Sequence, residues 1–370
     1  MQLVINTYGA SLRKKDDNFL VSVDDKKSEV SPKKVSSILI STSAVITTDA
    51  LHLAIENNIE VVMLDYSGQP FARVWHCRPG STNRIRRLQL YLDRIPLGLE
   101  MAKEWLSEKI TGRIEILKQM KKRRKVQEEL FDSVITELEE AESRIGLIKG
   151  TPGARRGEIM GLEGCCGRNY FAVLSQVLPS KFRFNGRSKN PAKDPFNAML
   201  NYAYGVLYSK VESACIIAGL DPYVGILHTD NYNKLSLVYD IIEMFRPWAE
   251  ETVIFLFTGR RVDDDFFRES KGGVFLDKPG KQVLIAALGE MFEKTERFQK
   301  RNIKRLNIIQ FRCHQIANQI LKEVKYDAGM GDLRHNEKQT EEPCCEDLQT
   351  DGVIPGAEIS LSWDAGDGGN

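Results

Sequence analysis

The spacing of hydrophobic residues changes once along the chain, near residue 80, and this change limits the folds that the chain can adopt. Up to residue 75, short runs rich in Val, Ile and Leu alternate with polar clusters, which is typical of strands and turns. From Arg84 to about residue 326, apolar residues mostly recur at helical spacing. Between these regions, Cys77–Asn83 (CRPGSTN) has the composition of a linker. We therefore predict an α+β protein in which a small, β-sandwich-like N-terminal domain precedes a larger all-α domain.

The same patterns predict where the domains and strands begin and end. The predicted domains are residues 1–76 (β domain), 77–86 (linker), 87–326 (α-helical domain) and 327–370 (acidic tail). The predicted strands are Leu3–Tyr8, Asn18–Val23, Val35–Ile40 and Ile59–Leu64. Thr48 is expected to cap a short helix that ends near Glu56. Asp65–Gln69 is expected to form the turn of a hairpin that ends in Phe71–Trp75.

Charge is distributed unevenly, although the net charge of the whole chain is only +1. Residues 331–370 contain ten acidic side chains against Arg334 and Lys338, a net charge of −8. The first 330 residues contain 50 basic and 41 acidic side chains, a net charge of +9. A basic body suits a polyanionic partner, although many soluble enzymes share a moderate positive charge. The tail is acidic, Gly-rich and aperiodic, so we expect it to be disordered.

Several classes of protein are disfavoured. We expect a cytoplasmic protein without a membrane span, because no basic N-terminal segment precedes an apolar signal core and no apolar run approaches about 18 residues. The seven cysteines include two adjacent pairs, Cys165–Cys166 and Cys344–Cys345, but no regular framework, which favours a reducing compartment. No CxxC motif or Cys/His cluster is present, so a zinc site is not expected.

One histidine and two acids lie close together in the segment Gly225–Arg246. Its apolar residues recur at helical spacing and predict a helix with one buried face, made by Leu237, Val238, Ile241, Ile242 and Phe245. Asp240 and Glu243 fall on the other face, where their carboxylates can share one hard cation or repel each other. His228 follows a short apolar stretch. The alternative is a structural histidine beside an ordinary polar helix face.

Two basic segments are candidates for contact with phosphate groups. Lys121–Lys125 precedes the acidic stretch Glu137–Glu142, a pattern that also fits a solvated helical hairpin. From about Ile285 to Val324 the spacing predicts a helix with a strongly basic face, made by Lys294, Arg297, Lys300, Arg301, Lys304 and Arg305. That face can bind backbone phosphates or simply be solvated.

Four segments in this order resemble one known family. They are MGLEGCCGRNYF (160–171), DPFNAMLNYAY (194–204), GILH (225–228) and LVYDIIEMFRP (237–247). Together they resemble the CRISPR-associated adaptation integrases called Cas-one, which insert new spacers in antiviral defence. The resemblance covers about residues 1–325 and includes the order of a β domain followed by a helical catalytic domain. Cys165 and Cys166 stand where we expect other small residues in this family, and both are oxidisable.

The resemblance implies a catalytic metal site. Its ligands would be Glu163, His228 and Glu243, with Asp240 as a further acid beside them. Carboxylates and one imidazole suit Mg²⁺ or Mn²⁺, which can polarise a phosphodiester and lower the pKa of an attacking hydroxyl. Tyr170 and Asn197 match recurring family positions near the site. Their alternative role is local hydrogen bonding that holds the helices in register.

The implied reaction is attack by a DNA 3′-hydroxyl on a phosphodiester of the CRISPR repeat, and attack by water would give endonuclease activity. The implied partners are DNA, namely the incoming spacer duplex and the repeat, a second copy of the chain, and the smaller protein Cas-two. The resemblance implies a homodimer built partly through the β domain. The weaker candidates for DNA contact are Arg84, Arg86, Arg87, Lys294, Arg297, Arg301 and Arg305. Two other readings are a DNA-binding scaffold without catalysis and a transposon-type integrase of the same fold.

Overall fold

The computed structural model describes residues 2–35, 37–57, 59–65, 70–74, 83–124, 128–270 and 272–323. The strands are β1 (Gln2–Ile5), β2 (Ser11–Lys15), β3 (Asn18–Val23), β4 (Lys26–Val30), β5 (Ser37–Ile40), β6 (Val45–Ile46), β7 (Glu60–Leu64), β8 (Pro70–Val74), β9 (Phe267–Ser270), β10 (Gly273–Leu276), β11 (Thr295–Phe298) and β12 (Arg301–Lys304). The α-helices are α1 (Thr48–Glu56), α2 (Asn83–Gln89), α3 (Pro96–Lys121), α4 (Glu128–Leu147), α5 (Pro152–Val177), α6 (Pro195–Ile217), α7 (Ser236–Ile241), α8 (Arg246–Thr258), α9 (Lys278–Glu293) and α10 (Arg305–Glu323). The 3₁₀-helix η5 (Ile242–Phe245) joins α7 to α8.

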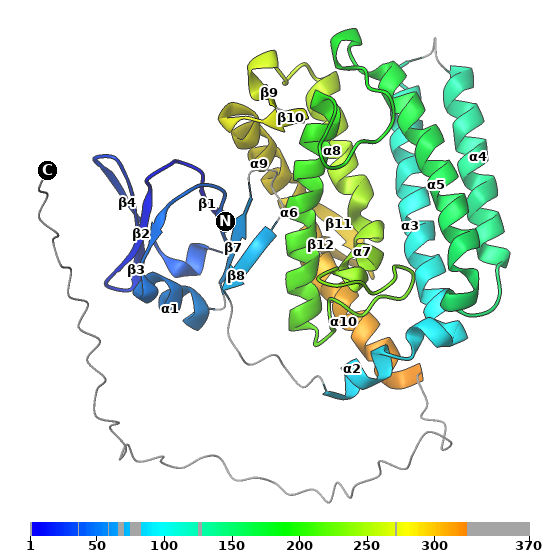
Figure 1. Ribbon diagram of the computed structural model, residues 1–370, viewed down its shortest axis with the longest axis horizontal. Helices are drawn as coiled ribbons and strands as arrows, with labels where there is room; N and C mark the ends of the chain where they lie inside the picture. Colours follow the sequence, from blue (N-terminus) through cyan, green and yellow to red (C-terminus); the bar gives the residue numbers. More distant parts are fainter. Residues whose placement is uncertain are drawn as a thin grey trace, which may run out of the picture. The chain divides into compact units, whose positions relative to one another are not determined.

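Two four-stranded sheets form the N-terminal region (Figure 1). In the first, of order β1-β5-β7-β8, the strands β1, β5 and β7 run parallel and β8 is antiparallel to β7. In the second, of order β4-β3-β2-β6, only the pairing of β2 with β6 is parallel. Both sheets and α1 contribute to one hydrophobic core, with Leu12, Phe19 and Leu53 among its buried residues. The sequence prediction of a β region followed by a mostly helical region is confirmed.

The central strands of the first sheet are buried on both faces. Side chains alternate along a strand, so successive residues of β5 face opposite sides of the sheet. Ile38 and Ile40 pack into the core shared with the second sheet, whereas Leu39 packs into the core of the helical region. On β7, Val61 packs into the core shared by the two sheets, and Val62 packs into the core of the helical region. The continuous apolar runs in the sequence therefore reflect a sheet that lies between two cores.

Buried charges join the first sheet to α6. The Lys210 ammonium donates to the hydroxyl of Ser37 at 2.8 Å and lies 3.5 Å from a carboxylate oxygen of Glu60. Arg73 on β8 forms an ion pair with Glu212 at 2.8 Å. Because buried charges are stable only when they are paired, these contacts specify how β5, β7 and β8 meet α6.

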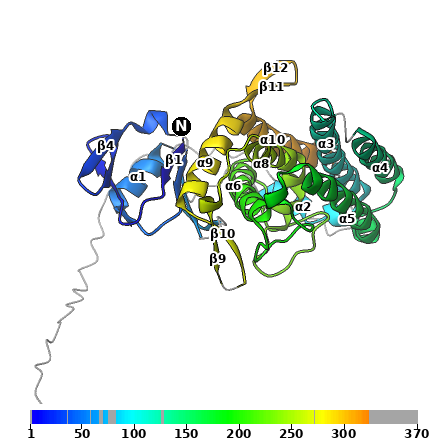
Figure 2. The same ribbon diagram turned by 90° about the horizontal axis from the view of Figure 1, so that it is seen from above.

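The helical region contains two packed groups of helices. The helices α3, α4 and α5 lie side by side, and α6 packs against α8 and α10 (Figures 1 and 2). Two antiparallel hairpins, β9–β10 and β11–β12, interrupt the helices. The sequence predicted an all-α domain. Helices do form most of the region, but the two hairpins are an exception to that prediction.

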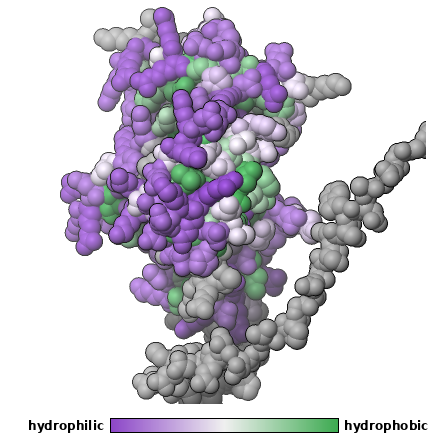
Figure 3. Space-filling model, turned by 90° about the vertical axis from the view of Figure 1, so that its left-hand side faces the viewer, coloured by the Kyte–Doolittle hydropathy of each residue, from purple (hydrophilic) through white to green (hydrophobic). Residues whose placement is uncertain are grey.

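The face of the molecule shown in Figure 3 is largely hydrophilic. Hydrophobic residues reach this surface only in separate patches. In the N-terminal region, large apolar side chains that remain exposed are Tyr8, Val45 and Phe71.

In the N-terminal region the expected strands are present, but β2, β4 and β6 were missed. β4 lies in the polar segment between the predicted strands Asn18–Val23 and Val35–Ile40, which was interpreted as a turn. It was missed because its Lys26, Lys27 and Glu29 are exposed on an edge strand. Charged residues are a common protection of such edges. The cap of α1 was misplaced by one residue, since the hydroxyl of Thr47 accepts the N–H of Ala50 at 3.4 Å.

The predicted helix over 285–324 is also wrong. α9 ends at Glu293, and the hairpin β11–β12 follows before α10 begins. Gln299 and Lys300 form its turn with φ angles of +46° and +68°. Tight hairpin turns with two positive φ angles usually contain Asn or Gly. Because Gln299 and Lys300 are neither, the local sequence did not indicate a turn. Of the predicted linker 77–86, residues 77–82 lie outside the described residues and residues 83–86 belong to α2. The predicted tail also lies outside the described residues.

Candidate active site

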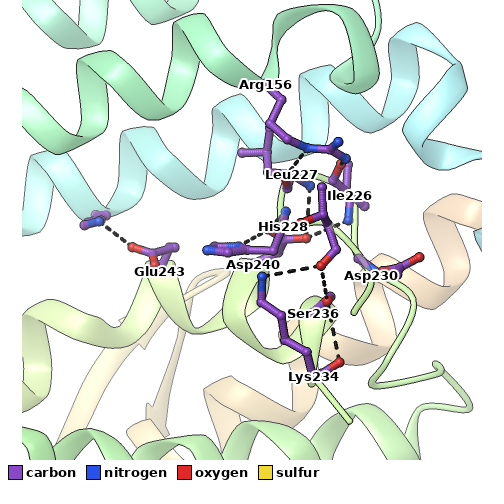
Figure 4. A network of polar contacts seen from close by, with 12 residues as sticks. Arg156, Ile226, Leu227, His228, Asp230, Lys234, Ser236, Asp240 and Glu243 are labelled. Carbon is purple, nitrogen blue, oxygen red and sulfur yellow. Dashed lines mark hydrogen bonds and ion pairs between the residues drawn. The ribbon is translucent and has the colours of Figure 1, made fainter. Parts of the chain in front are cut away.

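The carboxylate of Asp240 on α7 holds the loop that carries His228 (Figure 4). The backbone N–H groups of Ile226 and Leu227 donate to its Oδ2 at 2.6 and 3.1 Å. The backbone N–H of His228 donates to Oδ1 at 3.0 Å, and the ring Nδ1 of His228 lies 2.7 Å from the same oxygen. Asp240 is buried, so these four contacts satisfy a charge that would otherwise be unstable in the interior.

The other side of this loop is held by α5 and by a glycine. Arg156 on α5 donates through Nη2 to the carbonyl of Ile226 at 3.3 Å and through Nε to that of Leu227 (Figure 4). A Cβ atom at Gly225 would lie 2.5 Å from the carbonyl oxygen of His228 and 2.6 Å from Cβ of Ser236. The loop can approach α7 this closely only because residue 225 has no side chain.

The contact with Asp240 also determines the tautomer of His228. An ionised carboxylate only accepts hydrogen bonds, so Nδ1 of the neutral ring carries the proton. Nε2 then keeps its lone pair and can bind a metal ion or accept a proton. A carboxylate that orients a histidine in this way is a common feature of metal sites.

Two further carboxylates meet at Lys109. Glu163 on α5 accepts a hydrogen bond from the Lys109 ammonium, which α3 supplies. Oε2 of Glu243 on η5 lies 2.5 Å from the same ammonium nitrogen. Oε1 of Glu243 accepts from Nε of Arg246 at 2.8 Å. Helices that are distant in sequence thus bring Glu163 and Glu243 to one point.

These cations keep both carboxylates ionised. Burial acts to raise the pKa of Glu243, but the attraction of Arg246 and Lys109 outweighs burial and lowers that pKa to about 2. The pKa of Glu163 is also lowered, because Lys109 outweighs the opposing effects of burial and of the nearby Glu243. Both side chains are therefore negatively charged at neutral pH.

Asp240 and Glu243 do not act as the adjacent pair that the sequence suggested. The expected apolar face is buried, but α7 ends at Ile241 and Glu243 lies in the tighter η5. Asp240 bonds to the His228 loop, whereas Glu243 bonds to Lys109 and Arg246. Both acids are buried, so neither belongs to a solvated polar face.

All four predicted site residues line one small cavity of about 40 Å³. They are Glu163, His228, Asp240 and Glu243. Oε2 of Glu243 is buried and receives no well-aligned hydrogen bond from the described residues. Oxygen and imidazole donors suit a hard divalent cation, so the residue types fit Mg²⁺ or Mn²⁺. Their present positions do not form a coordination shell: among the described residues, no three His, Cys, Asp or Glu side chains are grouped closely enough to hold a metal ion.

A buried network that the sequence did not reveal lies behind this cavity. Arg113 on α3 donates to Glu250 on α8 through Nε at 3.1 Å and through Nη2 at 2.7 Å. The hydroxyl of Tyr204 on α6 donates to the same carboxylate at 2.6 Å. Burial acts to raise the pKa of Glu250, but Arg113 and Tyr204 lower it to about 2. The network joins α3, which carries Lys109, to α6 and α8.

Tyr170 and Asn197 have different positions relative to the site. Tyr170 is wholly buried on α5, where its ring lies 4.7 Å from the Arg113 guanidinium carbon. Asn197 donates to the carbonyl of Gly186 at 3.0 Å, and its side-chain oxygen accepts from the N–H of Ser188 at 3.2 Å. Neither lines the small cavity, and the contacts of Asn197 are those of local hydrogen bonding.

A larger cavity of about 860 Å³ opens beside His228 and was not predicted. Aromatic and basic side chains line much of it: Tyr202, Tyr204, Tyr208, Tyr239, Arg187, Lys189, Lys234 and Arg246. Burial, Arg246 and Arg187 together lower the pKa of Lys189, which shows that cations are crowded here. These residues are spread over about 60 positions of the sequence, so no local motif marks them.

The candidate DNA-binding residues lie elsewhere. Arg84, Arg86 and Arg87 are on α2, and Lys294, Arg297 and Arg301 are exposed on or beside the β11–β12 hairpin. None of these six lines the small cavity or the larger cavity beside His228. Lys294 and Arg297 instead line a separate cavity of about 500 Å³.

The prediction that Arg305 belongs to an exposed basic face is wrong. Its side chain is buried, with Nη2 paired to Glu296 at 2.5 Å and to Glu251 at 3.4 Å. Its guanidinium carbon lies 4.9 Å from the ring centre of Trp248. Arg305 therefore holds α8, α10 and the hairpin together, and it is not available to a phosphate group.

The chain is similar to known proteins of one family. The family model described as "CRISPR associated protein Cas1" matches residues 3–290. A "CRISPR-associated endonuclease Cas1 1" from Archaeoglobus fulgidus is 30% identical over 342 residues, which are 88% of this chain and 98% of that protein. A "CRISPR-associated protein Cas1 3" from Methanobrevibacter ruminantium is 30% identical over 287 residues, covering 75% of this chain and 84% of that protein.

Solved structures show the same fold. A casposase bound to integration product is 21% identical and superposes with a TM-score of 0.73, covering 92% of this chain and 96% of that chain. A Cas1 protein from Thermotoga maritima is 19% identical, with a TM-score of 0.72 and coverages of 87% and 98%. In the described part of the chain, no helix is long and apolar enough to cross a membrane. By the family model and by these relatives, the chain belongs to the Cas1 family, the Cas-one family that its motifs resemble.

Proposed function

We propose that the protein is a metal-dependent DNA integrase of CRISPR adaptation that inserts new spacers and also cleaves DNA. The observation that carries this proposal is the convergence of Glu163, His228 and Glu243 on one cavity, beside a larger cavity rich in cations and tyrosines. Membership of the Cas1 family supports it, as does the word endonuclease in the names of several relatives. The casposase of similar fold was solved with an integration product.

Glu163, His228 and Glu243 would hold Mg²⁺ or Mn²⁺, which when bound supplies polarisation of the scissile phosphodiester and a lower pKa for the attacking hydroxyl. The protein's own groups prepare this site. Asp240 holds the His228 ring through Nδ1 and fixes its loop, so the lone pair of the neutral ring lies on Nε2. Arg246 keeps Glu243 ionised. In the proposed reaction, the 3′-oxygen of the incoming strand bonds to a repeat phosphorus while the repeat's own 3′-oxygen leaves.

The larger cavity would hold the nucleotides next to the reacting phosphate. Tyrosine rings can stack on bases of any sequence, and crowded cations can bind the phosphates between them. Arg187, Lys189 and Arg246 supply the cations, and Tyr202 and Tyr239 are among the rings. A phosphate placed here would relieve the repulsion that lowers the pKa of Lys189. DNA binding should therefore weaken steeply with salt.

The proposed partners are a second copy of the chain and the smaller protein Cas2. A Cas6-RT-Cas1–Cas2 complex contains a chain of similar fold, with 24% identity and a TM-score of 0.71. On the β domain, Tyr8, Val45 and Phe71 are exposed, and apolar side chains of this kind are commonly buried in interfaces between subunits. We propose that the homodimer forms partly through this domain.

The test is a joining assay. The full chain and its small partner are incubated with Mn²⁺, a fluorescent duplex with free 3′ ends and a supercoiled plasmid that carries a CRISPR repeat. Wild type is expected to join the label to the repeat. His228→Ala, Glu163→Gln and Glu243→Gln are each expected to lower joining by at least about 100-fold, as for loss of a metal ligand.

Matched controls come from exposed residues. The control variants are Glu158→Gln and His52→Ala. Glu158 lies on the same helix as Glu163, and His52 lies on α1. Both should retain wild-type joining. Full joining by His228→Ala would show that the ligand set is wrong. Tight DNA binding without joining or nicking would favour a scaffold without catalysis, and joining that ignores the repeat would favour a transposon-type integrase.

A further inference from the structure

The ammonium group of Lys109 lies between Glu163 and Glu243, two of the proposed metal ligands. Its side chain is only 3% exposed, and its ammonium contacts both Glu163 and Glu243. The residue comes from the middle of α3, where Trp105 and Leu106 line the same small cavity one turn earlier. The aliphatic stem is thus enclosed, and the charge ends among the carboxylates.

The positive charges of Lys109 and Arg246 match the negative charges of Glu163 and Glu243, while the carboxylate of Asp240 is bonded to the His228 loop. Arg113, the next cation on α3, forms its ion pair with Glu250. A divalent cation bound by Glu163 and Glu243 would add two positive charges beside an ammonium that already contacts both. Like charges at such short range repel strongly when they are partly removed from water.

We propose that Lys109 is a built-in competitor of the divalent cation, which can bind Glu163 and Glu243 only when the Lys109 ammonium moves away. This inference rests on the proposed function, because it takes these carboxylates as metal ligands. Lys109 then lowers the affinity of the site for Mg²⁺ or Mn²⁺. Glu163 and Glu243 stay paired with Lys109 until the cation concentration is high enough to displace the ammonium.

The alternative is that Lys109 only supports the carboxylates, and the two roles predict opposite signs. Loss of a supporting residue loosens the ligands and weakens metal binding. Loss of a competitor leaves the same ligands with one positive charge fewer, so metal binding becomes tighter. Lys109→Met keeps the length of the stem and removes the charge. Lys118→Met on the same helix is the matched control, because Lys118 is exposed and lies 3.6 Å from Glu139.

The experiment is a calorimetric titration of the DNA-free full-length proteins with Mn²⁺. We expect Lys109→Met to bind Mn²⁺ with a Kd at least about ten-fold lower than that of wild type, as for removal of a neighbouring like charge. Lys118→Met should match wild type. If wild type binds Mn²⁺, His228→Ala abolishes binding, and Lys109→Met binds equally or more weakly, the metal site stands and the role of Lys109 as a competitor is wrong. If neither wild type nor Lys109→Met binds Mn²⁺ at millimolar concentration, the proposed metal site and this inference both fail.

A second measurement uses only the wild-type protein, in case Lys109→Met does not fold. Brief acetylation with and without Mn²⁺, followed by peptide mass spectrometry, reports the access of reagent to each lysine. Acetylation of Lys109 should increase several-fold with Mn²⁺. Lys103, held on the same helix by Glu100 and the carbonyl of Ile148, should be unaffected. Unchanged or reduced acetylation of Lys109 at a Mn²⁺ concentration that saturates the site would overturn the proposal.

Discussion

His228 and Asp240 are joined at two points, through the ring Nδ1 at 2.7 Å and the backbone N–H at 3.0 Å, both to the same carboxylate oxygen. One acid therefore determines the path of the loop and the orientation of the imidazole. The sequence indicated a role for Asp240 as a second acid beside Glu243. The structure shows instead that its oxygens are used by the His228 loop.

Asp240→Asn should impair both stability and activity. The amide that replaces one oxygen has no negative charge, and its NH₂ group would face an N–H donor of the loop. We expect a loss of about 2 to 4 kcal/mol in the free energy of unfolding, as for hydrogen bonds to a buried charge. Joining activity should fall by about 10- to 100-fold, which is typical for loss of a residue that orients a metal-binding histidine. Urea unfolding and the joining assay measure the two effects.

The matched control for Asp240 is Asp230→Asn in the same loop. Asp230 accepts one hydrogen bond, from the N–H of Gly225 at 2.9 Å, and is exposed. Its replacement should change stability by less than about 0.5 kcal/mol. Equal effects of the two substitutions would contradict the specific role of Asp240.

Glu250 should make stability depend on pH in the acid range. Folding lowers its pKa from 4.5 to about 2, so its contribution is complete above pH 4.5 and is lost as the pH falls towards 2. Glu250→Gln should cost about 3 kcal/mol or more at pH 7, because the Arg113 charge is left buried without its partner. Between pH 5 and pH 3, the stability of the variant should change less than that of wild type. Urea unfolding at several pH values tests this, with the exposed Glu140→Gln on α4 as a control that should follow wild type.

Substitutions of Arg305 and Arg301 should have different effects on stability, although both residues belong to the predicted basic face. Arg305→Ala removes the buried partner of Glu296 and Glu251 and should lower the free energy of unfolding by about 3 kcal/mol. Arg301 is exposed on β12, so Arg301→Ala should change stability by less than about 0.5 kcal/mol. If the hairpin contacts DNA, Arg301→Ala should reduce the slope of log K against log salt by about 1. Thermal unfolding and binding titrations at several salt concentrations separate these effects.

The adjacent cysteines Cys165 and Cys166 should react differently with iodoacetamide. Cys165 is exposed on α5, whereas Cys166 is buried and its thiol pKa is raised, mainly by burial. The thiolate is the reactive form, so Cys165 should be alkylated at least about ten-fold faster. Peptide mass spectrometry resolves the two positions. Equal rates in the folded protein would show that Cys166 is not protected as the structure indicates.

Local sequence patterns alone determined the positions of several secondary-structure elements. β3 lies where a run rich in apolar residues predicted it, and the apolar face from Leu237 to Phe245 is buried as expected. The edge strand β4 and the β11–β12 hairpin escaped prediction. Charged residues mark the first, and the turn of the second contains neither Asn nor Gly.

The sequence by itself determined the order of a β region and a helical region, the family, and the three acids and one histidine that line the small cavity. Only the tertiary structure decided how those side chains are used. Lys109 lies 54 residues from Glu163, and Arg113 lies 137 residues from Glu250. No periodicity within a helix carries information about such pairs. They form because helices pack on their apolar faces, and the few charges trapped between them must then find partners.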